Sequence, residues 1–125
     1  MPDLGTENTP RERFIAEPKP GFDRRGSPRE PVFLTGLLVF GDDQIVACVI
    51  VDRSDSGFRV KLLEDAILPE HFGLIDLLSG VGHQCQAVWR KPPFAGMRKL
   101  ESHDLREPQD GVAANLQRVW RTALA

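Results

Sequence analysis

The sequence predicts an all-β domain, a small six-stranded antiparallel β-barrel, with a C-terminal α-helix and a flexible N-terminal arm. From Val32 onward, short apolar runs alternate with turn residues at intervals of about ten residues, which is typical of small barrels and sandwiches. The last stretch of the chain instead repeats its apolar residues with a helical period. At 125 residues, of which 41% are hydrophobic, the chain fits one domain.

The N-terminal segment differs in composition from the rest of the chain. Six of the ten prolines fall within the first 31 residues, and large apolar residues are few there. Such a segment buries too little apolar surface to offset a backbone ordering cost of roughly 1 to 2 kcal/mol per residue. We therefore expect residues 1–23 to form the flexible arm, residues 24–108 the barrel, and residues 109–125 a helix that packs on the barrel.

Six apolar runs within the barrel segment have the length and pattern of strands. The second is almost wholly apolar, and the third alternates strictly between apolar and basic residues. The fifth places Cys85, Ala87 and Trp89 on one face, so Trp89 is expected to fill the core. The expected strands are residues 32–40, 44–51, 58–62, 72–78, 83–90 and 94–100.

The apolar residues of the last segment share one face of a helix. They follow the spacing i, i+4, i+7, i+8, i+11 and i+12, which is the pattern of an amphipathic helix. Trp120 is the largest of them and is expected to dock the helix on the barrel. The expected apolar face comprises Val112, Leu116, Val119, Trp120, Ala123 and Leu124.

Charge and hydropathy exclude several functions. The chain carries 16 basic and 18 acidic residues, a formal charge of −2, so no basic field is available to hold a polynucleotide. No apolar run approaches the roughly 18 to 20 residues that span a bilayer, and the N-terminus has no signal-peptide pattern, so we expect a cytoplasmic protein without membrane insertion. Cys48 and Cys85 each lie in an apolar run, which favours buried, reduced thiols.

Two short motifs stand out as candidate binding residues. Arg25 and Arg29 are four residues apart, but the Gly and Pro residues between and after them disfavour a helix, so both guanidinium groups extend from a loop before the first strand. The second motif, Asp-x-Ser-x-x-Gly, is formed by Asp52, Ser54 and Gly57 at the end of the second strand. Taken alone, it is equally consistent with an ordinary hairpin turn.

Together these motifs resemble the signature of the PilZ domain, the bacterial receptor module for the second messenger cyclic di-GMP. That family carries Arg-x-x-x-Arg before its first strand and (Asp/Asn)-x-Ser-x-x-Gly at a later turn. Residues 84–90 and 94–97 also look like strands of this family, and the resemblance covers residues 24 to 100. It implies a PilZ-like barrel that binds cyclic di-GMP. The implied ligand-binding residues are Arg24, Arg25, Arg29, Asp52, Ser54 and Gly57.

The chemistry of these residue types suits a guanine dinucleotide. An arginine fork matches the O6 and N7 acceptors of guanine, while a carboxylate such as that of Asp52 accepts from its N–H donors. The resemblance implies that Arg25 and Arg29 close over the ligand, that Arg24 helps to neutralise phosphate, and that Gly57 leaves room for it. Ligand-induced ordering of this loop would then relay the signal to a downstream protein partner.

Other functions are weighed against the receptor. A PilZ-fold adaptor that does not bind nucleotide and acts by protein–protein contacts is the main alternative. An OB-like barrel for single-stranded RNA is a third reading, disfavoured by the charge. A zinc site would need ligands from His71, His83, Cys85 and His103, whose spacing does not complete a tetrahedral set. No nucleophile with its base is evident, so no enzyme, cofactor or metal is expected.

Overall fold

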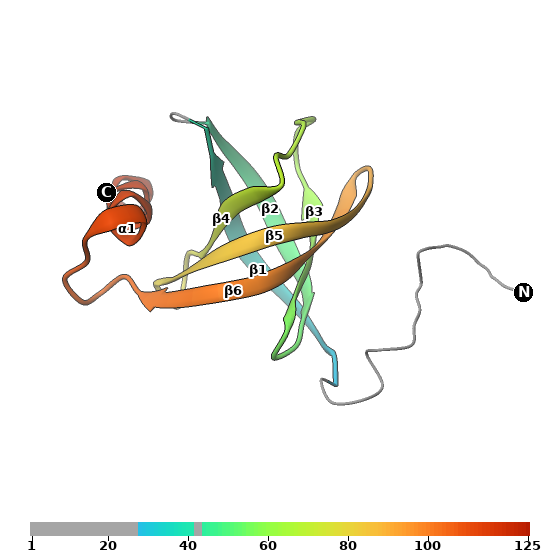
Figure 1. Ribbon diagram of the computed structural model, residues 1–125, viewed down its shortest axis with the longest axis horizontal. Helices are drawn as coiled ribbons and strands as arrows, with labels where there is room; N and C mark the ends of the chain where they lie inside the picture. Colours follow the sequence, from blue (N-terminus) through green and yellow to red (C-terminus); the bar gives the residue numbers. More distant parts are fainter. Residues whose placement is uncertain (1–27, 42–43) are drawn as a thin grey trace, which may run out of the picture.

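The computed structural model describes residues 28–41 and 44–125, and within these ranges it contains six strands and one helix (Figure 1). The arm expected for residues 1–23 lies outside the described residues. The elements are β1 (Glu30–Phe40), β2 (Gln44–Arg53), β3 (Gly57–Leu62), β4 (His71–Asp76), β5 (Val81–Lys91), β6 (Phe94–Asp104) and α1 (Gly111–Leu124).

The strands form one antiparallel sheet that closes on itself. Their order is β1-β2-β3-β6-β5-β4, and β4 pairs back with β1, which makes a closed barrel. This confirms the expectation of six antiparallel strands followed by a helix. The boundaries of every strand differ by a few residues from those expected, most in two places: β6 continues to Asp104, and β4 ends at Asp76. β4 ends there because the chain then turns and the Gly80 amide donates to the Asp76 carbonyl.

The barrel interior is filled by inward-facing apolar side chains of all six strands. Cys48 and Cys85 lie among them as free, buried thiols, as the sequence predicts. Burial away from water raises the pKa of each thiol to about 12, because the thiolate loses its hydration there. Both cysteines are therefore core residues and not reactive ones.

The prediction that Trp89 fills the core is wrong. Trp89 is 38% exposed, and β5 contains an irregularity between Ala87 and Trp89 where it pairs with β6. An extra residue in one strand reverses the alternation beyond it, so Trp89 leaves the interior face that Cys85 occupies. Its indole instead lies over Gly96 of β6, where a Cβ atom would overlap the indole nitrogen.

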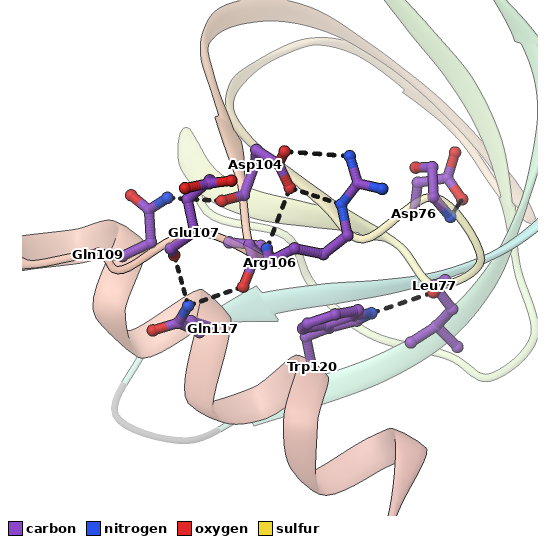
Figure 2. A network of polar contacts seen from close by, with 10 residues as sticks. Asp76, Leu77, Asp104, Arg106, Glu107, Gln109, Gln117 and Trp120 are labelled. Carbon is purple, nitrogen blue, oxygen red and sulfur yellow. Dashed lines mark hydrogen bonds and ion pairs between the residues drawn. The ribbon is translucent and has the colours of Figure 1, made fainter.

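Helix α1 packs beside the ends of β4, β5 and β6, at the left of Figure 1. Figure 2 shows the polar contacts that hold it. Gln117 Nε2 donates to the carbonyls of Leu105 and Glu107, each at 2.7 Å, and Trp120 Nε1 donates to the carbonyl of Leu77 at 3.0 Å. The predicted docking role of Trp120 is confirmed.

The apolar face of α1 is shorter than the sequence predicts. Leu116 and Val119 are buried, but Val112 and Leu124, at the two ends of the helix, are 61% and 56% exposed, because the barrel covers only the middle of the helix. Ala113 and Gln117 are buried in their place. In the part of the chain that the structure describes, no helix is long and apolar enough to cross a membrane.

Candidate ligand-binding site

The two sequence motifs meet where the start of β1 pairs with the end of β2. Arg29 immediately precedes β1, and Asp52 is the penultimate residue of β2. Arg29 donates to Asp52 Oδ1 from Nη2 at 2.6 Å and from Nε at 2.9 Å. Charged donors and acceptors at such distances form strong hydrogen bonds, so this pair ties together residues that are 23 positions apart in the sequence.

Asp52 is held from its other side by Arg59 of β3. The Arg59 Nε atom lies 3.0 Å from Asp52 Oδ2, so both carboxylate oxygens have a cationic partner. Asp52 is only 6% exposed, whereas Arg59 faces outward. The contact depends on a register irregularity between Ile50 and Asp52, because regular alternation would turn Asp52 inward with Ile50. Sequence reasoning missed Arg59, although its outward position follows from the alternation in β3.

Ser54 organises the turn between β2 and β3. Its amide donates to the Gly57 carbonyl at 2.9 Å, and its hydroxyl accepts from the Ser56 amide at 3.2 Å. The hydroxyls of Ser54 and Ser56 also lie 3.0 Å apart. These contacts are those of an ordinary polar turn, and they leave the Ser54 hydroxyl near the surface, two residues after Asp52.

Gly57 has a different role from the one that the resemblance implies. It pairs with Arg98 at the start of β3, and a Cβ atom there would overlap the carbonyl oxygen of Met97. Glycine is therefore required by the close approach of β3 to β6. The space next to its Cα is filled by the neighbouring strand, so the pairing of β3 with β6 is a structural reason for glycine at this position.

An exposed aromatic ring lies in the same row of the sheet. Asp52 pairs with Arg59, Arg59 with Gly96, and Gly96 with Trp89, so these four residues follow one another across β2, β3, β6 and β5. Trp89 is 38% exposed and its indole lies over Gly96, the residue that pairs with Arg59.

The structure thus brings Arg29 and Asp52 into contact and places Ser54 on the adjoining turn. Arg24 and Arg25 lie outside the described residues.

Within the described ranges, no group of three or more His, Cys, Asp or Glu side chains is arranged to hold a metal ion. His83, considered above as a zinc ligand, instead has its Nδ1 atom 2.7 Å from the Ser102 hydroxyl.

No protein-family model matches the chain, and no curated protein matches it. The resemblance to the PilZ domain therefore depends on the two motifs and on residues 84–90 and 94–97 alone.

Proposed function

We propose that this protein is a bacterial, cytoplasmic cyclic di-GMP receptor with a PilZ-like barrel. In this proposal it is not an enzyme, and it needs no metal or other cofactor. It binds the dinucleotide beside the paired ends of β1 and β2. The segment that precedes β1 closes over the ligand and relays the second-messenger level to a downstream protein.

The observation that carries the proposal is the contact between Arg29 and Asp52. The two motifs are separated by more than twenty residues in the sequence. Their side chains nevertheless meet, with Arg29 Nη2 at 2.6 Å from Asp52 Oδ1. An arginine fork and a carboxylate on one surface supply the donors and acceptors that the two edges of guanine require.

The surroundings of this pair add to the proposal. Arg59 supplies a second guanidinium group, half exposed, that can contact phosphate. Trp89 offers a ring on which a base can stack, worth about 1 to 3 kcal/mol per base, and each bidentate arginine contact contributes a similar amount. Contacts of this kind reach the order of −8 kcal/mol that a micromolar site requires, after the cost of ordering the ligand.

The adaptor that does not bind nucleotide remains the second candidate, because of one observation. Both carboxylate oxygens of Asp52 already accept from arginines and the side chain is nearly buried, so a ligand that needs this carboxylate competes with Arg29 and Arg59 for it. In the adaptor, Asp52 serves only to join these segments of the barrel wall. A protein of this second kind would give no heat with cyclic di-GMP under any buffer condition.

The test is calorimetric titration of cyclic di-GMP at low salt into the wild-type chain and into Arg25→Ala and Arg29→Ala. The proposal predicts binding by the wild type and at least about tenfold weaker binding by each variant, the loss of one bidentate contact. Arg121→Ala, which removes an exposed arginine from the last turn of α1, is the matched control and should bind normally. Absence of binding by the wild type would refute the receptor and favour the adaptor.

A further inference from the structure

A pocket of about 560 Å³ adjoins the Arg29–Asp52 surface and extends beyond it into the end of the barrel. It lies at the end of the barrel where β1 and β3 begin and β2 ends. Its wall includes residues of all six strands, among them, in order around the barrel, Leu34, Ile50, Phe58, Lys99, His83 and Asp76. The lining also includes Glu30, Arg53 and Ser54, beside the Arg29–Asp52 pair. The volume falls within the range of small-molecule sites, and barrel mouths are common locations for them.

The inner wall of the pocket is apolar and aromatic. Leu34, Ile50 and Phe58 belong to the barrel core, and Phe58 is 5% exposed. The rings of Phe58 and His83 lie 4.6 Å apart between centroids, at an angle of 50°. A flat ring entering the pocket therefore meets aromatic side chains on at least one side, a favourable arrangement for a planar ligand.

His83 contributes a neutral ring. Burial, with help from the nearby Lys99 ammonium, lowers the pKa of His83 to about 4. At physiological pH the imidazole therefore carries no charge, and its Nδ1 atom is engaged with the Ser102 hydroxyl. The ring is thus a fixed, uncharged surface of the pocket.

Two groups of opposite charge flank His83. Asp76 is in β4 and Lys99 is in β6, the two strands that pair with β5 on either side of His83. Both charges act on the imidazole, in opposite directions. They are two strands apart, and they pair with β5 at Val81 and Cys85, so their backbones are also offset along the strands by roughly 13 Å. Both side chains line the pocket.

The Asp76 carboxylate is buried and only partly satisfied. It is 7% exposed, and its Oδ1 atom accepts one long hydrogen bond, from the Ser79 amide at 3.3 Å. Within the described part of the chain, Oδ2 has no hydrogen-bond or ion-pair partner. A buried carboxylate oxygen without a donor is unfavourable, so a ligand that supplies N–H groups gains from binding here.

We propose that the barrel-end pocket is a second binding site, adjacent to the Arg29–Asp52 surface and sharing Ser54 with it, and that it takes a guanine-type base. The neighbouring N1–H and N2–H donors of guanine would satisfy Asp76, the O6 acceptor would receive a hydrogen bond from Lys99, and the base plane would lie against His83 and Phe58. Adenine has an acceptor at N1 and a donor only at N6 on this edge, so it can give Asp76 one hydrogen bond in place of two and offers no oxygen to Lys99.

The test uses three mononucleotides with the same sugar and phosphate: GMP, IMP and AMP. In equilibrium dialysis we expect GMP to bind most tightly, IMP about tenfold more weakly because it lacks the N2 donors, and AMP more weakly still. Asp76→Asn keeps an oxygen for the Ser79 amide but loses the charge, and should weaken GMP binding at least about tenfold. Lys99→Met should weaken GMP binding and leave the IMP-to-GMP ratio unchanged.

Matched variants distinguish a loss of binding in this pocket from a general effect of mutation on the protein. Asp65→Asn and Lys61→Met change exposed residues that do not line the pocket, so they should bind GMP like the wild type. Arg29→Ala should lose cyclic di-GMP but keep GMP, so failure of one site is distinguishable from failure of the other. The proposal is overturned if GMP does not bind at millimolar concentration, if AMP binds equally well, or if Arg29→Ala abolishes GMP binding.

Discussion

Arg29 Nη2 lies 2.6 Å from Asp52 Oδ1, and this contact joins the residue before β1 to the end of β2. Arg59 holds the second oxygen of the same carboxylate from β3. One acidic side chain therefore connects three consecutive segments of the barrel wall at the point where the proposed ligand would bind. Both the free energy of unfolding and the affinity for the proposed ligand should therefore depend on Asp52, and the two can be measured separately.

Asp52→Asn should destabilise the fold more than the loss of an exposed ion pair would. Asp52 is nearly buried and its two arginine partners would lose a charged acceptor, so we expect a decrease of about 2 kcal/mol in the free energy of unfolding. Glu30→Gln is the control, because Glu30 pairs with Arg53 between the same two strands but in solvent, and should cost at most about 0.5 kcal/mol. If urea unfolding gave the same loss of free energy for Asp52→Asn and for Glu30→Gln, this account of Asp52 would be contradicted.

Gly57→Ala should destabilise the barrel through the pairing of β3 with β6. The added Cβ would overlap the Met97 carbonyl oxygen, which belongs to the backbone and cannot rotate away. Overpacking of this kind costs about 1 to 3 kcal/mol. Urea unfolding of Gly57→Ala and of Ser56→Ala, its exposed neighbour, measures the difference. A stable Gly57→Ala variant that merely lost ligand binding would show that Gly57 instead leaves room for the ligand.

Gly96→Ala should displace Trp89 from its place on the outer surface of the barrel. The added methyl group would occupy the position of the indole nitrogen. The chain has two tryptophans, so an amide correlation spectrum shows two indole N–H signals. The signal of Trp89 should move, while that of Trp120, bonded to the Leu77 carbonyl on α1's side of the barrel, should stay. An unchanged Trp89 signal would mean that the indole does not lie over Gly96.

Stability should fall as the pH decreases from about 6.5 to about 4, in part because of His83. The folded protein resists protonation of this buried ring down to a pKa of about 4, whereas the unfolded chain takes up the proton near 6.5. Protons then favour the unfolded state, with a total effect on the order of 3 kcal/mol. His83→Gln removes this titration, so its unfolding free energy should vary less between pH 7.5 and pH 4.5 than that of the wild type.

His71→Gln serves as the control for the pH experiment, because His71 is an exposed residue at the start of β4. It should keep the wild-type pH dependence, including the contribution of the carboxylates that titrate in the same range. If His83→Gln and the wild type lost stability in parallel, His83 would not be the buried titrating group.

The strand pattern could be predicted from the sequence because each strand carries its own periodic signal. The direction of the side chains next to register irregularities could not be predicted from this signal. Trp89 and Asp52 each follow a place where the register shifts, and one extra residue exchanges the inner and outer faces without leaving any mark in the hydrophobic pattern. The same limit explains why Arg59 was missed, since its importance depends on Asp52 turning toward it.

The helix shows a second limit. Periodicity identified α1 and its docking residue Trp120, but it could not tell how far the barrel extends beneath the helix. Val112 and Leu124 have the right spacing and remain exposed, while Gln117 is buried because its side chain donates to two free carbonyls, those of Leu105 and Glu107. Burial of a polar residue by hydrogen bonding is invisible to a hydrophobic pattern.

The most direct test of the proposed receptor site is an amide correlation spectrum of the full chain recorded during titration with cyclic di-GMP. The account predicts saturable shifts at Arg29, at residues 52–57 and at the Trp89 indole, with little change in α1. Saturable shifts confined to other parts of the barrel, or no shifts at millimolar ligand, would contradict it.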